Sequence, residues 1–320
     1  MKIVVLDGDL LSKGEAFYDV LKTIGEYEYY ADTDYGNEDE IVQRIGDADA
    51  VFINKVPMTE SVMKRCPNLK FIGETATGYN NVDVAAAKKL GVTVSNVPTY
   101  GTMTVAQFAM ALLLEICNSV GHHAAEVAKG RWIKEGKVSF WDIPSIELAG
   151  KTLGIIGYGH IGHAFAAMAK AMGMNIIASH PRKMGQKFDL GMYVSLEELL
   201  QQADVISLHC PLTEETKEII NEKTIQQMQD GVIIINTSRG QLIDEKALAA
   251  ALNLGKVLAA GLDVVSTEPM QPDNPLLQAK NCYITPHMAW SAKAARQRLI
   301  DTSVENLKAF MAGMPINVVS

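Results

Sequence analysis

The chain has 320 residues, of which 48% are hydrophobic and 21% charged, and its formal net charge is −8. This composition is ordinary for a globular protein and excludes a wholly disordered or collagen-like chain, and the length predicts two domains of about 150 residues each. The acidic balance argues against a nucleic-acid partner, which usually requires a basic face.

The first apolar run, residues 3–6, stops at Asp7 and is too short for the core of a signal peptide. No uninterrupted apolar stretch approaches the roughly 18 residues of a membrane span, so we expect no membrane partner. The four cysteines are scattered, without a CxxC pair. This pattern predicts buried, unpaired thiols and a cytoplasmic location.

Short β-branched runs alternate with stretches of helical period, which predicts an α/β fold with parallel sheets covered on both faces. The predicted strands are residues 2–6, 50–54, 70–73, 92–96, 152–157, 175–179, 204–210, 232–236, 257–262 and 282–285. The main predicted helices are residues 102–120, 160–172, 195–203, 244–254 and 291–311. Ser195 and Asp244 are typical helix N-caps, and Gly255 is a typical helix stop.

The domain boundary is predicted near Asn96-Val97-Pro98, where the first α/β run ends. A long helical pattern and an irregular aromatic segment, residues 130–144, separate it from a second α/β run that starts at Lys151. The last helical stretch follows the last strand, and the sequence pattern leaves open which domain it packs on.

A GxGxxG motif lies between the predicted strand 152–157 and the predicted helix 160–172. It consists of Gly157, Tyr158, Gly159, His160, Ile161 and Gly162. In this context it is a dinucleotide-binding turn: Gly157 permits the tight turn, Gly159 lets a pyrophosphate approach, and Gly162 lets the helix pack on the strand. The helix N-terminus supplies N–H groups for the phosphates.

The end of the next strand bears on the choice between NAD and NADP. An NAD site usually has an acidic residue there, about 20 residues beyond the glycines. Here the strand runs instead into His180, Pro181, Arg182 and Lys183. Cations suit a 2′-phosphate, so NADP is favoured over NAD. The alternative is that Arg182 and Lys183 are a solvated turn.

Three further segments follow predicted strands, where open α/β sheets place their ligands: residues 235–240, 261–269 and 284–287. Together with Gly78-Tyr79-Asn80-Asn81-Val82-Asp83 and Asn96-Val97-Pro98, they resemble the D-2-hydroxyacid dehydrogenase family over nearly the whole chain. The run Pro286-His287-Met288-Ala289-Trp290 is similar to the glycerate dehydrogenase/hydroxypyruvate reductase branch.

The resemblance implies two doubly wound parallel-sheet domains. A flavodoxin-like substrate domain would comprise residues 1–100 plus 288–320, and a Rossmann domain binding NAD(P) would comprise residues 101–287. Residues about 120–145 resemble the family's dimer arm, which implies a homodimer. Trp141 in this arm is expected either to reach a neighbouring active site or to pack in the interface.

The resemblance also implies the reaction, in which a hydride passes between NAD(P)H and a small 2-oxo acid such as hydroxypyruvate or glyoxylate to give the D-2-hydroxy acid. Arg239 is the expected substrate anchor, because its planar fork suits a carboxylate. His287 is the expected acid/base, since histidine titrates near neutral pH. Glu268 would orient His287 and favour its charged form.

Further positions are carried over from the resemblance. The substrate-binding candidates are Lys55, Thr77 and Gly78, where Lys55 is equally well explained as a solvated lysine. The remaining cofactor-binding candidates are Thr104, Cys210, Pro211, Thr216, Thr237, Ser238 and Asp263.

Two alternatives share the same fold: a dinucleotide-sensing corepressor-like binding protein and a phosphite-type dehydrogenase. Glu268 argues against the formate-oxidising branch, which lacks it. The other histidines are interpreted as structural or surface residues; they are His122, His123, His160, His163 and His209. The adjacent pair His122 and His123 hints at a metal, but the sequence shows no further ligand cluster, so no metal site is predicted.

Overall fold

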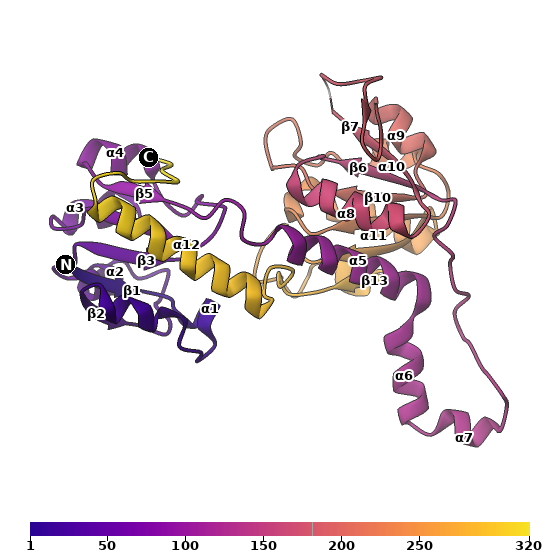
Figure 1. The fold of residues 1–320 in the computed structure, drawn as a ribbon. Coiled ribbons are helices and arrows are strands. Elements are labelled where there is room, and N and C mark those ends of the chain that lie inside the picture. Colours follow the sequence, from indigo (N-terminus) through magenta and orange to yellow (C-terminus); the bar gives the residue numbers. More distant parts are fainter. Residues whose placement is uncertain (181) are drawn as a thin grey trace. The chain divides into compact units, whose positions relative to one another are not determined.

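The computed structural model describes residues 1–180 and 182–320, and the chain divides into two compact units (Figure 1). Unit 1 comprises Met1–Gly101 and Ser291–Ser320, and unit 2 comprises Thr102–Trp290. The C-terminal segment therefore belongs to the same unit as the first hundred residues. The chain passes between units at residues 101/102 and 290/291, where the resemblance implied 100/101 and 287/288.

Unit 1 is built on a five-stranded, wholly parallel sheet in the order β2-β1-β3-β4-β5. Its elements are β1 (Lys2–Val5), α1 (Asp9–Ser12), η1 (Phe17–Thr23), β2 (Glu26–Tyr29), α2 (Glu38–Ile45), β3 (Ala50–Ile53), α3 (Glu60–Arg65), β4 (Phe71–Glu74), α4 (Val84–Leu90), β5 (Thr93–Ser95) and α12 (Lys293–Met311). This is the flavodoxin-like order, in which the strand order reverses between β1 and β3.

Helix α12 is tied to the sheet of unit 1 by aromatic packing and by buried amides. Phe310 packs on Phe71 of β4 with ring centroids 5.1 Å apart. The buried Asn306 donates from Nδ2 to the carbonyl of Asn96 at 2.9 Å, and Asn96 donates from Nδ2 to the carbonyl of Thr77 at 2.8 Å. The returning helix therefore fixes the segment that carries Thr77, a substrate-binding candidate.

Unit 2 contains an eight-stranded sheet in the order β13-β12-β11-β10-β6-β7-β9-β8. Its elements are α5 (Thr102–Asn118), α6 (Val120–Ala128), α7 (Arg131–Glu135), β6 (Thr152–Ile156), α8 (His160–Ala171), β7 (Asn175–Ser179), β8 (Lys187–Phe188), β9 (Gly191–Val194), α9 (Leu196–Gln202), β10 (Val205–Leu208), α10 (Glu222–Gln227), β11 (Val232–Asn236), η2 (Gly240–Leu242), α11 (Glu245–Leu254), β12 (Val257–Leu262), η3 (Pro275–Gln278) and β13 (Cys282–Ile284). Among the strands of the described residues of this unit, only β8 is antiparallel to its neighbour. From β6 outward this is the doubly wound order of nucleotide-binding sheets, with the reversal between β6 and β10.

The apolar run of β11 shows why the sheet of unit 2 is covered on both faces. Ile233 and Ile235 belong to the core cluster under α5 and α8, whereas Val232 and Ile234 belong to the cluster under α9, α10 and α11. Successive strand residues point to opposite faces, so an unbroken apolar run is stable only where both faces are buried. The predicted fold class is confirmed.

Each predicted strand forms, with both ends within two residues of the predicted bounds, and the predicted caps are in place. The Ser195 hydroxyl accepts from the N–H of Glu198 at 3.0 Å, and Asp244 accepts from two N–H groups of α11. The sequence missed β2, β8 and β9. Strand β2 reads Glu-Tyr-Glu-Tyr and lies at a half-exposed sheet edge, so it lacks the buried apolar run that marked the other strands.

The predicted helix 102–120 ends earlier, because Ser119 adopts a left-handed conformation with φ of 48° and separates α5 from α6. Among the described residues no single helix is long and apolar enough to cross a membrane. Helices α5 and α6 meet the length and composition test only as a pair bent by 62°, and α5 packs its apolar side into the core of unit 2.

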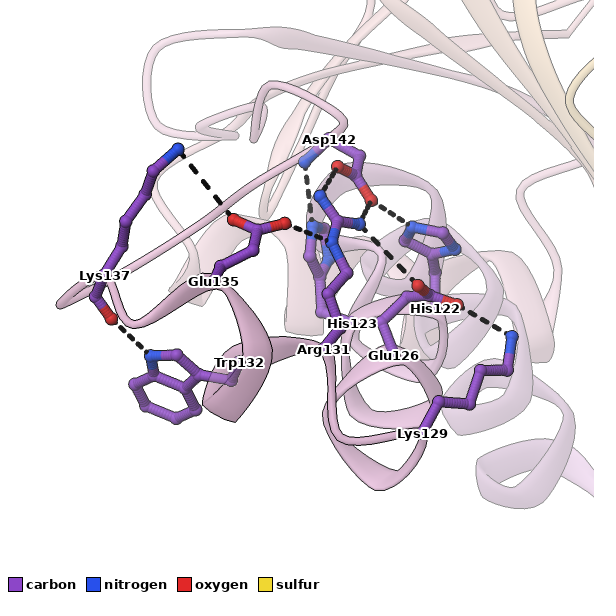
Figure 2. A network of polar contacts seen from close by, with 9 residues as sticks. All are labelled: His122, His123, Glu126, Lys129, Arg131, Trp132, Glu135, Lys137 and Asp142. Carbon is purple, nitrogen blue, oxygen red and sulfur yellow. Dashed lines mark hydrogen bonds and ion pairs between the residues drawn. The ribbon is translucent and has the colours of Figure 1, made fainter.

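Residues 120–145, called the arm below, project from the rest of unit 2 (Figure 1) and are held by a charged network (Figure 2). Arg131 makes a bidentate contact with Asp142, in which Nη1 donates to Oδ2 at 2.6 Å and Nη2 donates to Oδ1 at 2.7 Å. His122 Nε2 lies 2.8 Å from the same Oδ2. Arg131 and His122 hold the pKa of Asp142 well below its usual range. Neither α6 nor α7 buries a residue in this chain, so polar contacts give the arm its shape.

Candidate active site

The GxGxxG turn joins β6 to α8 at the point where the strand order of unit 2 reverses. Gly157 has φ of 99°, and a Cβ there would lie 2.3 Å from the backbone N of Cys210, which follows β10. A Cβ at Gly162 would lie 2.4 Å from the carbonyl oxygen of Gly157. A Cβ at Gly159 would meet no atom within 4 Å. Gly157 and Gly162 are therefore required by the turn itself, whereas the space at Gly159 is open to a ligand.

The other residues of this turn differ in their surroundings. The Tyr158 hydroxyl donates to Asp189 Oδ1 at 3.2 Å, and the Tyr158 ring packs on Phe188 with centroids 4.2 Å apart. His160 is exposed at the start of α8, and Ile161 packs against the core. A mostly apolar hollow of about 850 Å³ lies beside the turn, lined in part by Gly159 and His160.

The segment after β7 carries the cations expected near a 2′-phosphate. Pro181 lies outside the described residues. Arg182 and Lys183 are exposed, and Lys183 Nζ lies 5.3 Å from the ring centroid of Tyr193. His180 Nδ1 accepts from the N–H of Arg182 at 3.2 Å.

Hydroxyl groups hold the loop after β10 by donating hydrogen bonds to its backbone carbonyl groups. Thr216 donates from Oγ1 to the carbonyl of Pro211 at 2.7 Å, and Ser238 donates from Oγ to the carbonyl of Cys210 at 2.7 Å. The Thr237 hydroxyl is buried without a hydrogen-bond partner among the described residues. A buried hydroxyl without a partner is costly, which is consistent with a ligand completing this site.

These features fit a bound dinucleotide. The space at Gly159, the unpaired hydroxyl of Thr237 and the N-terminus of α8 lie along the edge of one sheet. The first N–H groups of a helix have no acceptor within the helix and favour phosphate. Thr104 lies half-buried in the first turn of α5.

The three catalytic candidates follow three neighbouring strands. Arg239 follows β11, Glu268 follows β12, and His287 follows β13. Because these strands are parallel neighbours, their carboxyl ends meet at one edge of the sheet. The fold thus places all three side chains at the same edge as the phosphate turn.

His287 and Glu268 form a close pair. His287 Nδ1 lies 2.6 Å from Glu268 Oε2, so the Nδ1–H group donates a hydrogen bond to the carboxylate. The other ring nitrogen, Nε2, is then the one that can exchange a proton with a substrate. His287 has φ of 49°, an uncommon conformation for a residue other than glycine. Its N–H donates to the carbonyl of Asp263 at 2.8 Å, so the backbone around it is held in this conformation.

Asp263 organises the segment that follows His287. Its carboxylate accepts from the Thr285 hydroxyl at 2.6 Å, the Met288 N–H at 2.9 Å and the Ala289 N–H at 2.7 Å. Burial raises the pKa of Asp263, and these donors oppose the rise. The resemblance implied a nicotinamide contact for Asp263; the geometry shows that Asp263 holds the backbone of residues 285–289, which the motif alone did not reveal.

Arg239 is positioned through its backbone by the fully buried Asn236. Asn236 donates from Nδ2 to the carbonyl of Arg239 at 2.8 Å and accepts the N–H of Ser238 at 3.0 Å. The next residue, Gly240, has no room for a side chain, because a Cβ there would lie 1.9 Å from the carbonyl carbon of Val265. In the sequence Asn236 is only one residue of the segment 235–240, with no signal of this role.

The substrate-binding candidates lie in unit 1. Lys55 is exposed after β3, at the reversal of strand order, and its N–H donates to the buried carboxylate of Asp7 at 2.6 Å. The backbone N–H groups of Thr77 and Gly78 donate to no acceptor within residues 1–180 and 182–320. Free amides and an exposed ammonium suit a carboxylate ligand.

The remaining histidines differ in their surroundings. Burial lowers the pKa of His209 to about 4, and its Nε2 lies 2.9 Å from the Ser207 hydroxyl, so it is a neutral structural residue. His163 lies 2.8 Å from Asp189 through Nε2, and His160 is exposed.

The pair His122 and His123 gains a third potential metal ligand in Asp142, with ligand atoms within 4.8 Å of one another. Asp142 lies 20 residues from His122 in the chain, so the sequence did not show this third ligand. These ligand atoms are nevertheless engaged in hydrogen bonds within the protein. Both carboxylate oxygens of Asp142 accept from Arg131, and His123 Nε2 accepts the N–H of Asp142 at 3.2 Å (Figure 2).

The sheet order and the glycine turn define unit 2 as a dinucleotide-binding domain, and the comparisons specify its family. The family profile described as "D-isomer specific 2-hydroxyacid dehydrogenase, NAD binding domain" matches residues 110–289. A hydroxypyruvate reductase of Blautia hydrogenotrophica is 54% identical over 321 residues, covering 100% of both chains. A glycerate dehydrogenase of Methylorubrum extorquens is 42% identical, covering 92% of each chain.

Solved structures agree with this placement. A Thermus thermophilus protein aligns with a TM-score of 0.88 and 34% identity, covering 100% of both chains. An NADPH-dependent glyoxylate/hydroxypyruvate reductase of Sinorhizobium meliloti aligns with a TM-score of 0.85 and 27% identity, covering 100% of this chain and 97% of that one.

The chain belongs to the D-isomer specific 2-hydroxyacid dehydrogenase family, as its motifs indicated. It is an oxidoreductase that uses a nicotinamide dinucleotide. The comparisons do not favour the corepressor-like and phosphite-type alternatives.

The different spaces around two glycines give a matched pair of variants. Gly162→Ala is expected to lower the free energy of unfolding by about 1–3 kcal/mol, because its Cβ would collide with a backbone carbonyl. Gly159→Ala is expected to fold with a near-normal melting temperature but to bind the dinucleotide about tenfold more weakly. Thermal unfolding and fluorescence titration with cofactor measure the two effects, and equal losses of stability in both variants would contradict this assignment.

Proposed function

We propose that this protein reduces a small 2-oxo acid of the hydroxypyruvate or glyoxylate type to the D-2-hydroxy acid, using NAD(P)H. The observation that carries the proposal is the pair His287–Glu268, with 2.6 Å between Nδ1 and Oε2, on the same sheet edge as Arg239 and the phosphate turn. The hydroxypyruvate reductase and glycerate dehydrogenase relatives support this substrate class.

Each side chain has a distinct part in the proposed reaction. The nicotinamide, when bound, supplies the hydride. Arg239 binds the carboxylate and polarises the carbonyl through its planar fork. His287 gives a proton from Nε2 to the forming alkoxide, while Glu268 holds the ring through Nδ1. In the reverse direction His287 takes the proton from the alcohol.

Unit 1 is the proposed substrate domain. The free N–H groups of Thr77 and Gly78 and the ammonium of Lys55 would bind the substrate carboxylate. The cofactor contacts proposed for Thr104, Thr216 and Asp263 belong to unit 2. The proposal thus needs both units for turnover but only unit 2 for cofactor binding.

Mixing the protein with NADH or NADPH and a panel of 2-oxo acids tests the activity. We expect loss of cofactor absorbance with hydroxypyruvate or glyoxylate and a D product on a chiral column. His287→Asn is expected to lower kcat by about 10²–10⁴-fold, as for loss of a positioned acid, with cofactor affinity unchanged. Absence of turnover with every acid in the panel, from a protein that binds cofactor, would refute the proposed function.

The proposed cofactor is NADP rather than NAD, supported by the exposed Arg182 and Lys183 after β7. Arg182→Ala is expected to raise KM for NADPH about tenfold and leave KM for NADH nearly unchanged, because only NADPH carries the 2′-phosphate. The exposed Lys187 of β8 provides a control, and Lys187→Ala should change neither value. A wild-type kcat/KM that favours NADH would overturn the assignment.

A homodimer through the arm is also proposed, supported by the apolar side chains that the arm exposes. These are Val120, Val127, Trp132, Ile133, Val138, Trp141 and Ile143. Several large apolar side chains exposed on one segment are typical of an interface. The four unpaired cysteines support a cytoplasmic location, since a reducing compartment keeps thiols free.

Light scattering after gel filtration tests the dimer. Ile133 in the arm is 89% exposed, and Leu254 at the end of α11 is 86% exposed. Ile133→Asp is expected to shift the mass from dimer towards monomer, because a charge would be buried in the interface. Leu254→Asp should leave the mass unchanged. A monomeric wild-type protein would contradict the proposal.

A further inference from the structure

Glu74 is a buried carboxyl group that the proposed reaction does not use. It is the last residue of β4 and is 0% exposed. Its Oε1 atom is buried without a hydrogen-bond partner among the described residues. The residues that follow it lead directly to Thr77 and Gly78.

Asn81 connects Glu74 to the loop after β3. Its Nδ2 donates to Glu74 Oε2 at 2.9 Å and to the carbonyl of Val56 at 3.1 Å. Its own carbonyl accepts the N–H of Met58 at 2.8 Å. Asn81 therefore holds the segment 74–81 against the loop 54–58, which carries Lys55.

The other side of the same loop is held by Asp7, which follows β1. Its carboxylate accepts the N–H groups of Asn54 at 2.9 Å, Lys55 at 2.6 Å and Val56 at 3.3 Å. The loop with Lys55 is thus fixed from two directions, by Asp7 across the reversal of strand order and by the pair Glu74–Asn81.

The charge state of Glu74 matters for this contact. Burial raises the pKa of Glu74 to about 9, the hydrogen bond from Asn81 opposes the rise, the negative charge of Asp7 adds to it, and Lys55 lowers it. At neutral pH Glu74 is therefore a neutral acid whose Oε2 accepts from Asn81. Ionisation would place a second negative charge near Asp7, in a fully buried site.

Resting on the proposed substrate-binding role of Lys55, Thr77 and Gly78, we propose that Glu74 and Asn81 are positioning residues for substrate binding. They hold the loop that carries Lys55 against the segment that carries Thr77 and Gly78. Neither side chain touches the reacting atoms in this scheme; both act through the backbone.

Steady-state kinetics on three variants tests this role. Glu74→Leu removes the acceptor of Asn81 and is expected to raise KM for hydroxypyruvate about tenfold, as for one lost buried hydrogen bond. KM for NAD(P)H and kcat should stay near wild type, since the cofactor turn and His287 belong to unit 2. Glu74→Gln keeps an acceptor and should restore most of the affinity. Glu26→Leu on the exposed strand β2 is the control and should change nothing.

The pH dependence separates positioning from simple packing. The KM of the wild type is expected to rise as the pH passes about 9, where Glu74 ionises. Glu74→Gln cannot ionise and should lack this rise, while Asp7 and Lys55, the charged groups that act on Glu74, are the same in both proteins. Identical pH profiles, or a Glu74→Gln variant as impaired as Glu74→Leu, would overturn the inference.

A readout without substrate keeps the inference distinct from the proposed function. Hydrogen exchange of the amides of Lys55 and Val56 should be faster in Glu74→Leu than in the wild type or in Glu74→Gln. Unchanged exchange at both amides would refute positioning, whatever the substrate is. Faster exchange in a protein that reduces no 2-oxo acid would support positioning and refute only the proposed function.

Thermal unfolding checks the premise that Glu74 is buried as a neutral acid. Folding raises the pKa of this carboxyl group, so above the ordinary pKa the unfolded chain loses the proton while the folded protein keeps it. The free energy of unfolding therefore falls as the pH rises from the ordinary pKa towards the raised one. Glu74→Gln is therefore expected to melt higher than the wild type at pH 8, with the gain disappearing as the pH falls towards the ordinary value of 4.5. An equal difference at all pH values would contradict the premise.

Discussion

The reversal of strand order in each parallel sheet is the constraint on which the candidate site depends. Parallel strands all end at one edge, and neighbouring loops diverge where the order reverses. In unit 2 this point lies between β6 and β10, where Gly157 meets Cys210. In unit 1 it lies between β1 and β3, where Asp7 meets Lys55. The residues at both points either contact the ligand in the proposed scheme or hold a residue that does.

Buried polar side chains convert these diverging loops into fixed geometry. Asn236 holds the backbone of Arg239, Asp263 holds the segment around His287, and Asp7 holds the loop of Lys55. A buried carboxylate or amide is tolerated only when it is hydrogen-bonded, so each of these groups restricts its loop to one arrangement. The exposed functional side chains can then act without being buried themselves.

The net charge of −8 excludes little about small anionic ligands. The relevant cations are few and local: Lys55 in unit 1, and Arg239, Arg182 and Lys183 in unit 2. Interactions between exposed charges fade within about 10 Å at ordinary salt, so the position of these groups matters more than the total charge.

The sequence by itself determined the fold class, the phosphate turn and the family, because glycine spacing, strand-like apolar runs and motif order are local properties of the chain. It could not determine that Asn306 and α12 brace the Thr77 segment, or that Asp142 joins the pair His122 and His123. The edge strand β2 was also not predicted, because glutamate and tyrosine alternate along it and it has no run of buried apolar residues. The partners of Glu74 were decided only by tertiary structure, because a buried hydrogen bond joins residues from different strands and loops, and no local pattern records which of them will meet.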